Sequence, residues 1–232
     1  LSLGDTIGVA TTGHVHRLLE ALDRRERRRH VSAEQPLSSP PLFWGLFVGV
    51  LADGTKTVQK VPVSADGQWP FYLGLYRASG SALGWLSFDH SEGVLSGLAS
   101  WIKPSVASKY YAGGFTNETT VTGSTWVAPT GPALAAAARS TLVDCVGANL
   151  SGEVTEELMV WPKGKTVSPG RGVNKFGFSP ATGLFKGSVL DPATHQTRSF
   201  TGVLLQKWSI GAGVVFGLNE VGAVEIAQPE SR

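Results

Sequence analysis

Cysteine is almost absent from this chain: Cys145 is the only one among 232 residues, which excludes an internal disulfide and an all-cysteine metal site. Net charge is also low, since 20 Lys and Arg against 18 Asp and Glu leave +2, too little to indicate a polyanionic partner. Long hydrophobic runs are missing too, because the longest, at 41–51, is about half as long as a membrane helix requires. The sequence therefore predicts no nucleic-acid partner, no membrane span, no metal and no cofactor.

Glycine and proline are abundant, with 29 and 13 residues, and they separate short runs in which apolar and polar side chains often alternate. Strands with one buried face have this period of two, and Gly, Pro and Asp-Gly pairs are typical of the turns between them. A hydrophobic content of 42% is that of a globular protein. The sequence therefore predicts an all-β fold of about twelve antiparallel strands.

Two stretches share one pattern, which is an apolar run, a polar turn and a second run that begins with glycine. The first lies at 83–99 and the second at 176–189, and both are predicted as hairpins. Gly97 and Gly187 hold matching places in them, where we expect a strand to pass close to a neighbouring backbone or to a large ring. The shared pattern predicts an internal repeat.

This repeat predicts two similar barrel-like or sandwich-like halves, at 42–128 and 141–232, joined by a linker at 129–140 that is rich in Pro, Gly and Ala. Residues 1–41 differ, because they hold the strongest helical pattern of the chain, from about 14 to 29. They are predicted as a short N-terminal helical appendage, foreign or truncated, that contributes little to the β core. The arginines at its end favour a solvated helix terminus over a nucleic-acid patch, since no aromatic residue is interleaved.

Residues with catalytic potential are few, and the pentapeptide Gly-x-Ser-x-Gly is absent. Ser100 and Lys103 fit a Ser-x-x-Lys pattern, in which the lysine would deprotonate the serine, although about one such match is expected by chance in this composition. His90 follows Asp89 and would act as a general base or metal ligand, with His195 in a comparable late turn. Solvated turn residues are the favoured interpretation of both histidines, because no third ligand lies at a spacing typical of a metal site.

Aromatic residues are plentiful, with seven Trp, four Tyr and ten Phe. Exposed rings on a sheet can stack against sugars, whereas β cores bury the same residues. Tyr110 and Tyr111 lie in a glycine-rich loop and are the rings most expected to be exposed, and Trp101 is a third ligand-binding candidate. The predicted partner is a glycan or another cell-surface polymer. Asp53 and Asp66 are predicted as turn residues, because neither lies in a loop with several oxygen ligands for calcium.

Short motifs occur in a fixed order over residues 45–226. They include Asp53-Gly54-Thr55, Trp69-Pro70, Ser100-Trp101-Ile102-Lys103-Pro104, Gly114-Phe115-Thr116-Asn117-Glu118 and Gly183-Leu184-Phe185-Lys186-Gly187. Together they resemble a poorly characterised β module found toward the C-termini of large predicted extracellular proteins of environmental bacteria, of the Verrucomicrobia type. The resemblance implies an extracellular or cell-surface setting on a larger polypeptide and supplies no catalytic residues. No signal peptide is visible in this chain.

The sequence thus favours a non-catalytic extracellular β module of a larger secreted or surface protein, serving adhesion, glycan contact or spacing. The alternative is a hydrolase acting on an ester, lactone or glycoside, with a site that loops would assemble from Ser, His and Asp residues. Its candidate residues are scattered along the chain, so the fold decides whether they meet.

Overall fold

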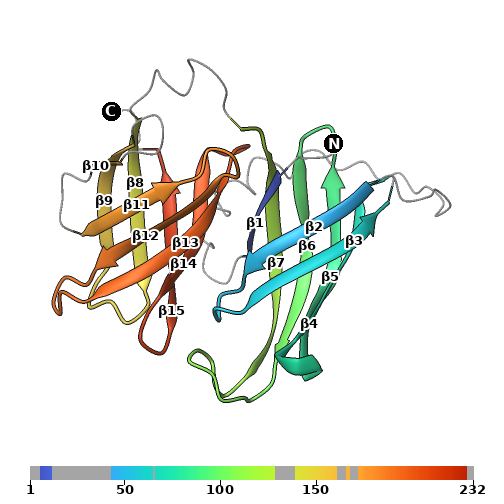
Figure 1. The fold of residues 1–232 in the computed structure, drawn as a ribbon, viewed down its shortest axis with the longest axis horizontal. Coiled ribbons are helices and arrows are strands. Elements are labelled where there is room, and N and C mark those ends of the chain that lie inside the picture. Colours follow the sequence, from blue (N-terminus) through green and yellow to red (C-terminus); the bar gives the residue numbers. More distant parts are fainter. Residues whose placement is uncertain are drawn as a thin grey trace.

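The computed structural model describes residues 6–11, 43–64, 66–128, 139–160, 166–167 and 172–228. They form antiparallel strands, β1 to β15, and one short 3-10 turn, η1 (Tyr76–Ala78), so the predicted all-β class is confirmed (Figure 1). No helix within these ranges has the length and apolar character that crossing a bilayer requires.

The first half consists of β1 (Thr6–Thr11), β2 (Phe43–Val50), β3 (Lys56–Val63), β4 (Gln68–Leu75), β5 (Gly80–Asp89), β6 (Val94–Lys103) and β7 (Phe115–Trp126). Five of these strands form a sheet in the order β1-β7-β6-β5-β4, and β2 and β3 form a separate hairpin. The hairpin crosses the sheet obliquely in Figure 1. Side chains of both layers share one core, in which Phe47 lies edge-on to Phe71 with 5.5 Å between ring centroids.

The second half consists of β8 (Arg139–Gly147), β9 (Val154–Val160), β10 (Thr166–Val167), β11 (Val173–Phe178), β12 (Leu184–Leu190), β13 (Thr197–Leu205), β14 (Ile210–Phe216) and β15 (Val221–Ala227). These strands form one curved sheet in the order β10-β9-β8-β15-β14-β13-β12-β11. β15 pairs with β8, so the last strand of this half lies beside its first, and the eight-stranded sheet curves into a nearly closed barrel with β10 and β11 at its edges. Its interior is filled by apolar side chains such as Phe185, Phe200 and Val215.

Both predicted hairpins are present. β5 pairs with β6, with Leu86 opposite Gly97, and β11 pairs with β12, with Phe176 opposite Gly187. Their places in the fold differ, because β5 and β6 lie inside a sheet whereas β11 is an edge strand. The internal repeat inferred from the two hairpins stays a prediction.

The N-terminal segment departs from its prediction in one place. Residues 6–11 form β1 and pair along β7, so this stretch of the predicted helical appendage is a strand of the five-stranded sheet. Its sequence, TIGVAT, contains the β-branched residues that favour strands. The predicted helix at 14–29 lies outside the described residues, as does the predicted linker at 129–140 apart from its last two residues, which begin β8.

The two halves touch along a seam. Trp126 at the end of β7 donates a hydrogen bond from Nε1 to the Pro180 carbonyl at 2.9 Å, and its ring lies edge-on to Phe178. The Tyr110 hydroxyl donates to the Gly217 carbonyl at 3.1 Å. Each half therefore has its own core, and aromatic side chains of the first half connect it to the second.

Candidate functional site

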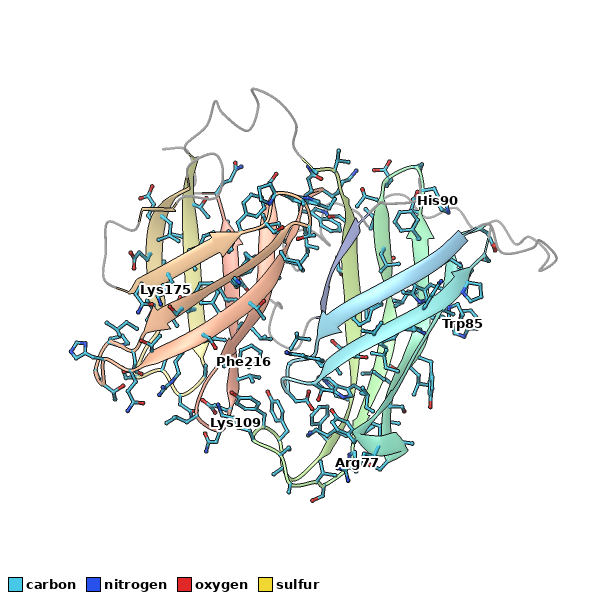
Figure 2. All side chains as sticks on the ribbon, in the orientation of Figure 1. Arg77, Trp85, His90, Lys109, Lys175 and Phe216 are labelled. Carbon is cyan, nitrogen blue, oxygen red and sulfur yellow. The ribbon has the colours of Figure 1, made fainter. Side chains whose placement is uncertain are left out.

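Of the predicted pair, Asp89 is the last residue of β5 and His90 begins the turn that follows the strand. Asp89 Oδ1 accepts hydrogen bonds from the Ser91 hydroxyl at 2.7 Å, from Ser91 N at 2.8 Å and from Glu92 N at 3.1 Å. These bonds, the Ser91 hydroxyl first, hold the pKa of Asp89 below its ordinary value. His90 is exposed and lies edge-on to Phe88 at one end of the first half (Figure 2). Asp89 therefore has a structural task, which is to stabilise the turn.

Ser100 and Lys103 lie on opposite faces of β6, because side chains alternate along a strand and these positions are three apart. Lys103 points into the core and is 3% exposed, whereas Ser100 lies on the outward face, paired with Leu83. The strand separates the two groups, which corrects the Ser-x-x-Lys interpretation. His195 lies in an exposed loop of the other half, between β12 and β13.

Lys103 belongs instead to a buried polar group, the Asp53 cluster, which consists of Asp53, Tyr76, Trp101 and Lys103. Lys103 Nζ lies 2.9 Å from Asp53 Oδ2, and both side chains are 1% exposed. The Tyr76 hydroxyl donates to the same Oδ2 at 2.6 Å and accepts a bond from Trp101 Nε1 at 3.0 Å. Lys103 Nζ also lies 4.2 Å from the centroid of the Tyr76 ring. Such mutual pairing is what buried charges require.

Three segments bring the Asp53 cluster together. Asp53 lies in the β2–β3 turn, where its Oδ1 accepts a bond from Thr55 N at 3.0 Å, and Lys103 ends β6. Tyr76 begins η1, in which three successive residues adopt the left-handed conformation, with φ of 53°, 58° and 69°. Each such residue costs on the order of 1–3 kcal/mol and persists only where its surroundings hold it. Asp53 is thus the predicted turn residue, and it is also the partner of a lysine 50 positions away.

Electrostatics fix the protonation of the cluster. Burial alone would raise the pKa of Asp53, but hydrogen bonds from Tyr76, Lys103 and Thr55 outweigh it and hold the pKa below its ordinary value. Burial first, and then the bond to Asp53 and its charge, raise the pKa of Tyr76 well above its ordinary value. Tyr76 therefore remains a hydrogen-bond donor. Asp53, Tyr76 and Lys103 line an open pocket of about 450 Å³ with Arg77 and Ser108.

The three predicted ligand-binding aromatics have other contacts. Tyr110 is 5% exposed and bonded across the seam, so its predicted exposure is wrong. Trp101 is half-buried in the Asp53 cluster. Tyr111 is exposed and lies edge-on to Phe115 at 5.4 Å between centroids. A surface that offers rings to a ligand must therefore be sought elsewhere.

Such a surface is the outward face of β4 to β7. Strand pairing aligns its side chains in three rows, which define the outer platform: Pro70-Trp85-Leu98-Thr120, Tyr72-Leu83-Ser100-Glu118 and Gly74-Ser81-Ile102-Thr116. Trp85 is 66% exposed and Tyr72 is 61% exposed. Figure 2 shows Trp85 at the outer side of the first half. Exposed apolar groups gathered in this way mark interaction sites.

The outer platform was not predicted from the sequence, because β5 carries apolar side chains on both of its faces. Leu86 and Phe88 face the core, whereas Leu83 and Trp85 face outward. The sequence did contain one sign that Trp85 faces outward. Ser81 and Ser87 lie on the same face of the strand as Trp85, because side chains alternate along a strand. A tryptophan in line with hydroxyl residues is the one expected to face solvent.

The chain matches no protein-family model, no curated protein and no solved structure. Within the described ranges, no three His, Cys, Asp or Glu side chains gather as a metal ion would require. Cys145 is buried, and burial first, then the charge of Asp144, raises the pKa of its thiol to about 12. The outer platform and the Asp53 cluster are therefore the two features of the described residues that bear on function.

Proposed function

We propose that this chain is a non-catalytic β module that binds a neutral polysaccharide through the outer platform. The observation that carries the proposal is the exposure of Trp85 and Tyr72 on one sheet face among serine and threonine hydroxyls. A sugar ring has apolar C–H faces, which pack against aromatic rings, and a rim of hydroxyls, which exchange hydrogen bonds with Ser and Thr. The platform supplies both kinds of partner.

Charge selects the class of polymer. Glu118 is the one charged residue in the three rows of the platform, and it is an acid. An anionic polysaccharide would need Lys or Arg to pair with its carboxylates or sulfates, and it would be repelled by Glu118. The proposed ligand is therefore an uncharged glycan.

The arrangement of the other candidates supports a non-catalytic role over the hydrolase. Asp89 and His90 lie at the C-terminal end of β5, whereas Lys103 lies at the opposite end of the β5–β6 pair and is bonded to Asp53. Ser100 belongs to the platform, where its cross-strand neighbours are Leu83 and Glu118 rather than a histidine. The extracellular setting, as part of a larger secreted or surface protein, is proposed on the sequence resemblance alone.

Retention on insoluble polysaccharides tests the proposal. The purified chain is mixed with cellulose, chitin and mannan as neutral probes and with alginate beads as an anionic one. We expect retention on at least one neutral polymer and none on alginate. Trp85→Ala and Tyr72→Ala should each weaken retention at least about twofold, since an aromatic contact contributes about 0.5–1.5 kcal/mol beyond its area. Leu218→Ala, in the second half at a residue 59% exposed, is the matched control and should change nothing.

Two results would contradict the proposal: no retention on any neutral polymer, or retention that Trp85→Ala leaves intact. A panel of chromogenic esters, lactones and glycosides runs in parallel. Turnover that is abolished by His90→Ala or by Ser100→Ala would favour the hydrolase instead.

A further inference from the structure

We infer that Lys103 and Asp53 become joined by an intramolecular isopeptide bond, which forms spontaneously once the chain has folded. The amine and the carboxylate are already in contact, with 2.9 Å between Nζ and Oδ2, and both side chains are 1% exposed. Holding two reactants in this way replaces a bimolecular encounter by a unimolecular step. Burial also keeps bulk water away from the reacting carbonyl carbon.

The surroundings of the Asp53 carboxylate match what amide formation needs. Thr55 N donates to Oδ1, the oxygen on which negative charge would develop when an amine adds to the carbon. The Tyr76 hydroxyl donates to Oδ2, the oxygen that would leave. Trp101 Nε1 donates to the Tyr76 oxygen, and this bond directs the tyrosine hydrogen toward Asp53. Each oxygen of the carboxylate therefore has the donor that its part in the reaction requires.

The reaction balances within the ion pair. Lys103 begins as –NH₃⁺ and Asp53 as –COO⁻, and a proton first moves from Nζ to Oδ2 across the 2.9 Å contact between them, an uphill step because the hydrogen bonds to Asp53 favour its charged form. The neutral amine attacks the carboxyl carbon, a C–N bond forms, and the C–Oδ2 bond breaks. Tyr76 gives a proton to the departing Oδ2 and regains one from the nitrogen. The products are one amide and one water, which leaves through the open pocket beside the cluster.

The bond would connect the two layers of the first half. Asp53 belongs to the β2–β3 hairpin and Lys103 to the five-stranded sheet, so the crosslink would fasten the hairpin across the sheet. A second ion pair provides an internal control. Lys207 and Glu92 also approach to 2.5 Å, but their side chains are 39% and 59% exposed. We expect that solvated pair to remain two separate side chains.

Mass spectrometry of the full, denatured chain tests the inference. The expected mass is lower than the sequence mass by one water. A tryptic digest should contain a branched peptide that joins residues 30–56 to residues 78–109. Trypsin leaves Lys103 uncut in either case because Pro104 follows it, so the branched mass is the diagnostic and a missed cleavage is not.

Variants separate the chemistry from effects on folding. Lys103→Arg keeps the positive charge but loses the amine, and it should show its full sequence mass. Tyr76→Phe keeps the ring and should lose water more slowly than the wild type, by about 100-fold or more, because a proton donor is missing. The inference is overturned if the wild-type chain keeps its full sequence mass after days in the folded state. It is also overturned if Lys103→Arg loses water, or if the branch joins another pair such as Lys207 and Glu92.

Discussion

The first half of the chain buries an ion pair at one end of its core and exposes a tryptophan and a tyrosine on its outer sheet face, whereas the second half fills its core with rings packed over glycines. In the second half Phe185 lies opposite Gly202, and Phe200 lies opposite Gly187, on paired strands. The ring of each phenylalanine occupies the space that a side chain on the opposing glycine would need. The same period-two pattern thus accommodates two different interiors.

The two halves also differ in how their exposed apolar residues are arranged. Exposed apolar residues of the second half, such as Val146, Leu184 and Leu218, come from different strands and a turn and form no aligned rows. Those of the first half share one face of adjacent strands. The proposed glycan binding would therefore involve the first half, and the second half would serve mainly as structural support.

Breaking the buried ion pair should have the largest effect. Lys103→Met leaves Asp53 buried without its cation, and removal of one partner of such a pair costs about 3–5 kcal/mol in free energy of unfolding. Urea titration measures this loss, which is expected with or without a covalent bond. Lys207→Met, in the exposed pair, should cost about 0–1 kcal/mol. Equal losses in the two variants would show that the buried ion pair contributes no more to stability than the exposed one, against this prediction.

Filling a glycine in the second half should have the next largest effect. A Cβ at Gly187 would lie 2.3 Å from the Lys175 carbonyl oxygen and 2.3 Å from the Phe200 ring, so Gly187→Val should destabilise by about 1–3 kcal/mol despite the better strand propensity of valine. The control is Gly177→Val on β11, where the nearest atom is 3.8 Å away. It should be neutral within about 0.5 kcal/mol. A neutral Gly187→Val in urea titration would mean that the Phe200 ring and the neighbouring strand both shift at little cost, which would contradict the tight packing over this glycine.

Weakening the seam should cost less. Trp126→Phe removes the hydrogen bond to the Pro180 carbonyl but keeps an aromatic ring beside Phe178. A bond of this kind contributes about 0.5–1.5 kcal/mol. Thermal unfolding followed by calorimetry should show a lower midpoint, and a transition broader than that of the wild type if the halves lose cooperativity. An unchanged profile would show that the seam depends on other contacts.

The smallest expected effect is a loss of stability in acid, which Asp191 in the second half should cause. Asp191 accepts bonds from Thr194 N, Ser151 N and the Ser151 hydroxyl, and these bonds, Thr194 first, lower its pKa. Because the folded pKa lies below the unfolded value of about 3.9, the stabilisation is present above about pH 4 and is lost as the pH falls through the folded pKa. Asp191→Asn should therefore be less stable than the wild type near pH 7, and this difference should shrink toward pH 2 in urea titrations. A difference that is constant with pH would exclude the carboxylate as its source.

Local features of the fold could be predicted from the sequence. Gly54 and Gly67 adopt positive φ in the Asp-Gly turns, and the β5–β6 hairpin follows from its polar turn and alternating strands. Pairings between residues far apart in the chain could not be predicted. The turn and strand preferences of single residues do not indicate that β15 pairs with β8 or that Asp53 pairs with Lys103.

The candidate site was predictable only in part. Strand alternation already places Ser100 and Lys103 on opposite faces, so that pair could have been rejected from the sequence. Tyr110 lies in a glycine-rich loop, which is why the sequence predicted an exposed ring. Its burial depends on contact with Gly217 in the other half, and the local sequence carries no sign of that contact. The strand of Trp85 is apolar on both faces, so Ser81 and Ser87 are the one local sign that Trp85 faces outward. The β2–β3 hairpin, which packs on Leu86 and Phe88, makes the other face the buried one.

The central claim is that the outer platform of the first half binds a neutral glycan, and hydroxyl-radical footprinting of the whole chain tests it most directly. Labelling is measured residue by residue, with and without a soluble neutral glycan such as laminarin or hydroxyethyl cellulose. The account predicts that labelling of Trp85 and Tyr72 falls when the glycan is bound, whereas labelling of Leu184 and Leu218 in the second half stays constant. Protection of Leu184 and Leu218, with Trp85 and Tyr72 still labelled, would contradict it.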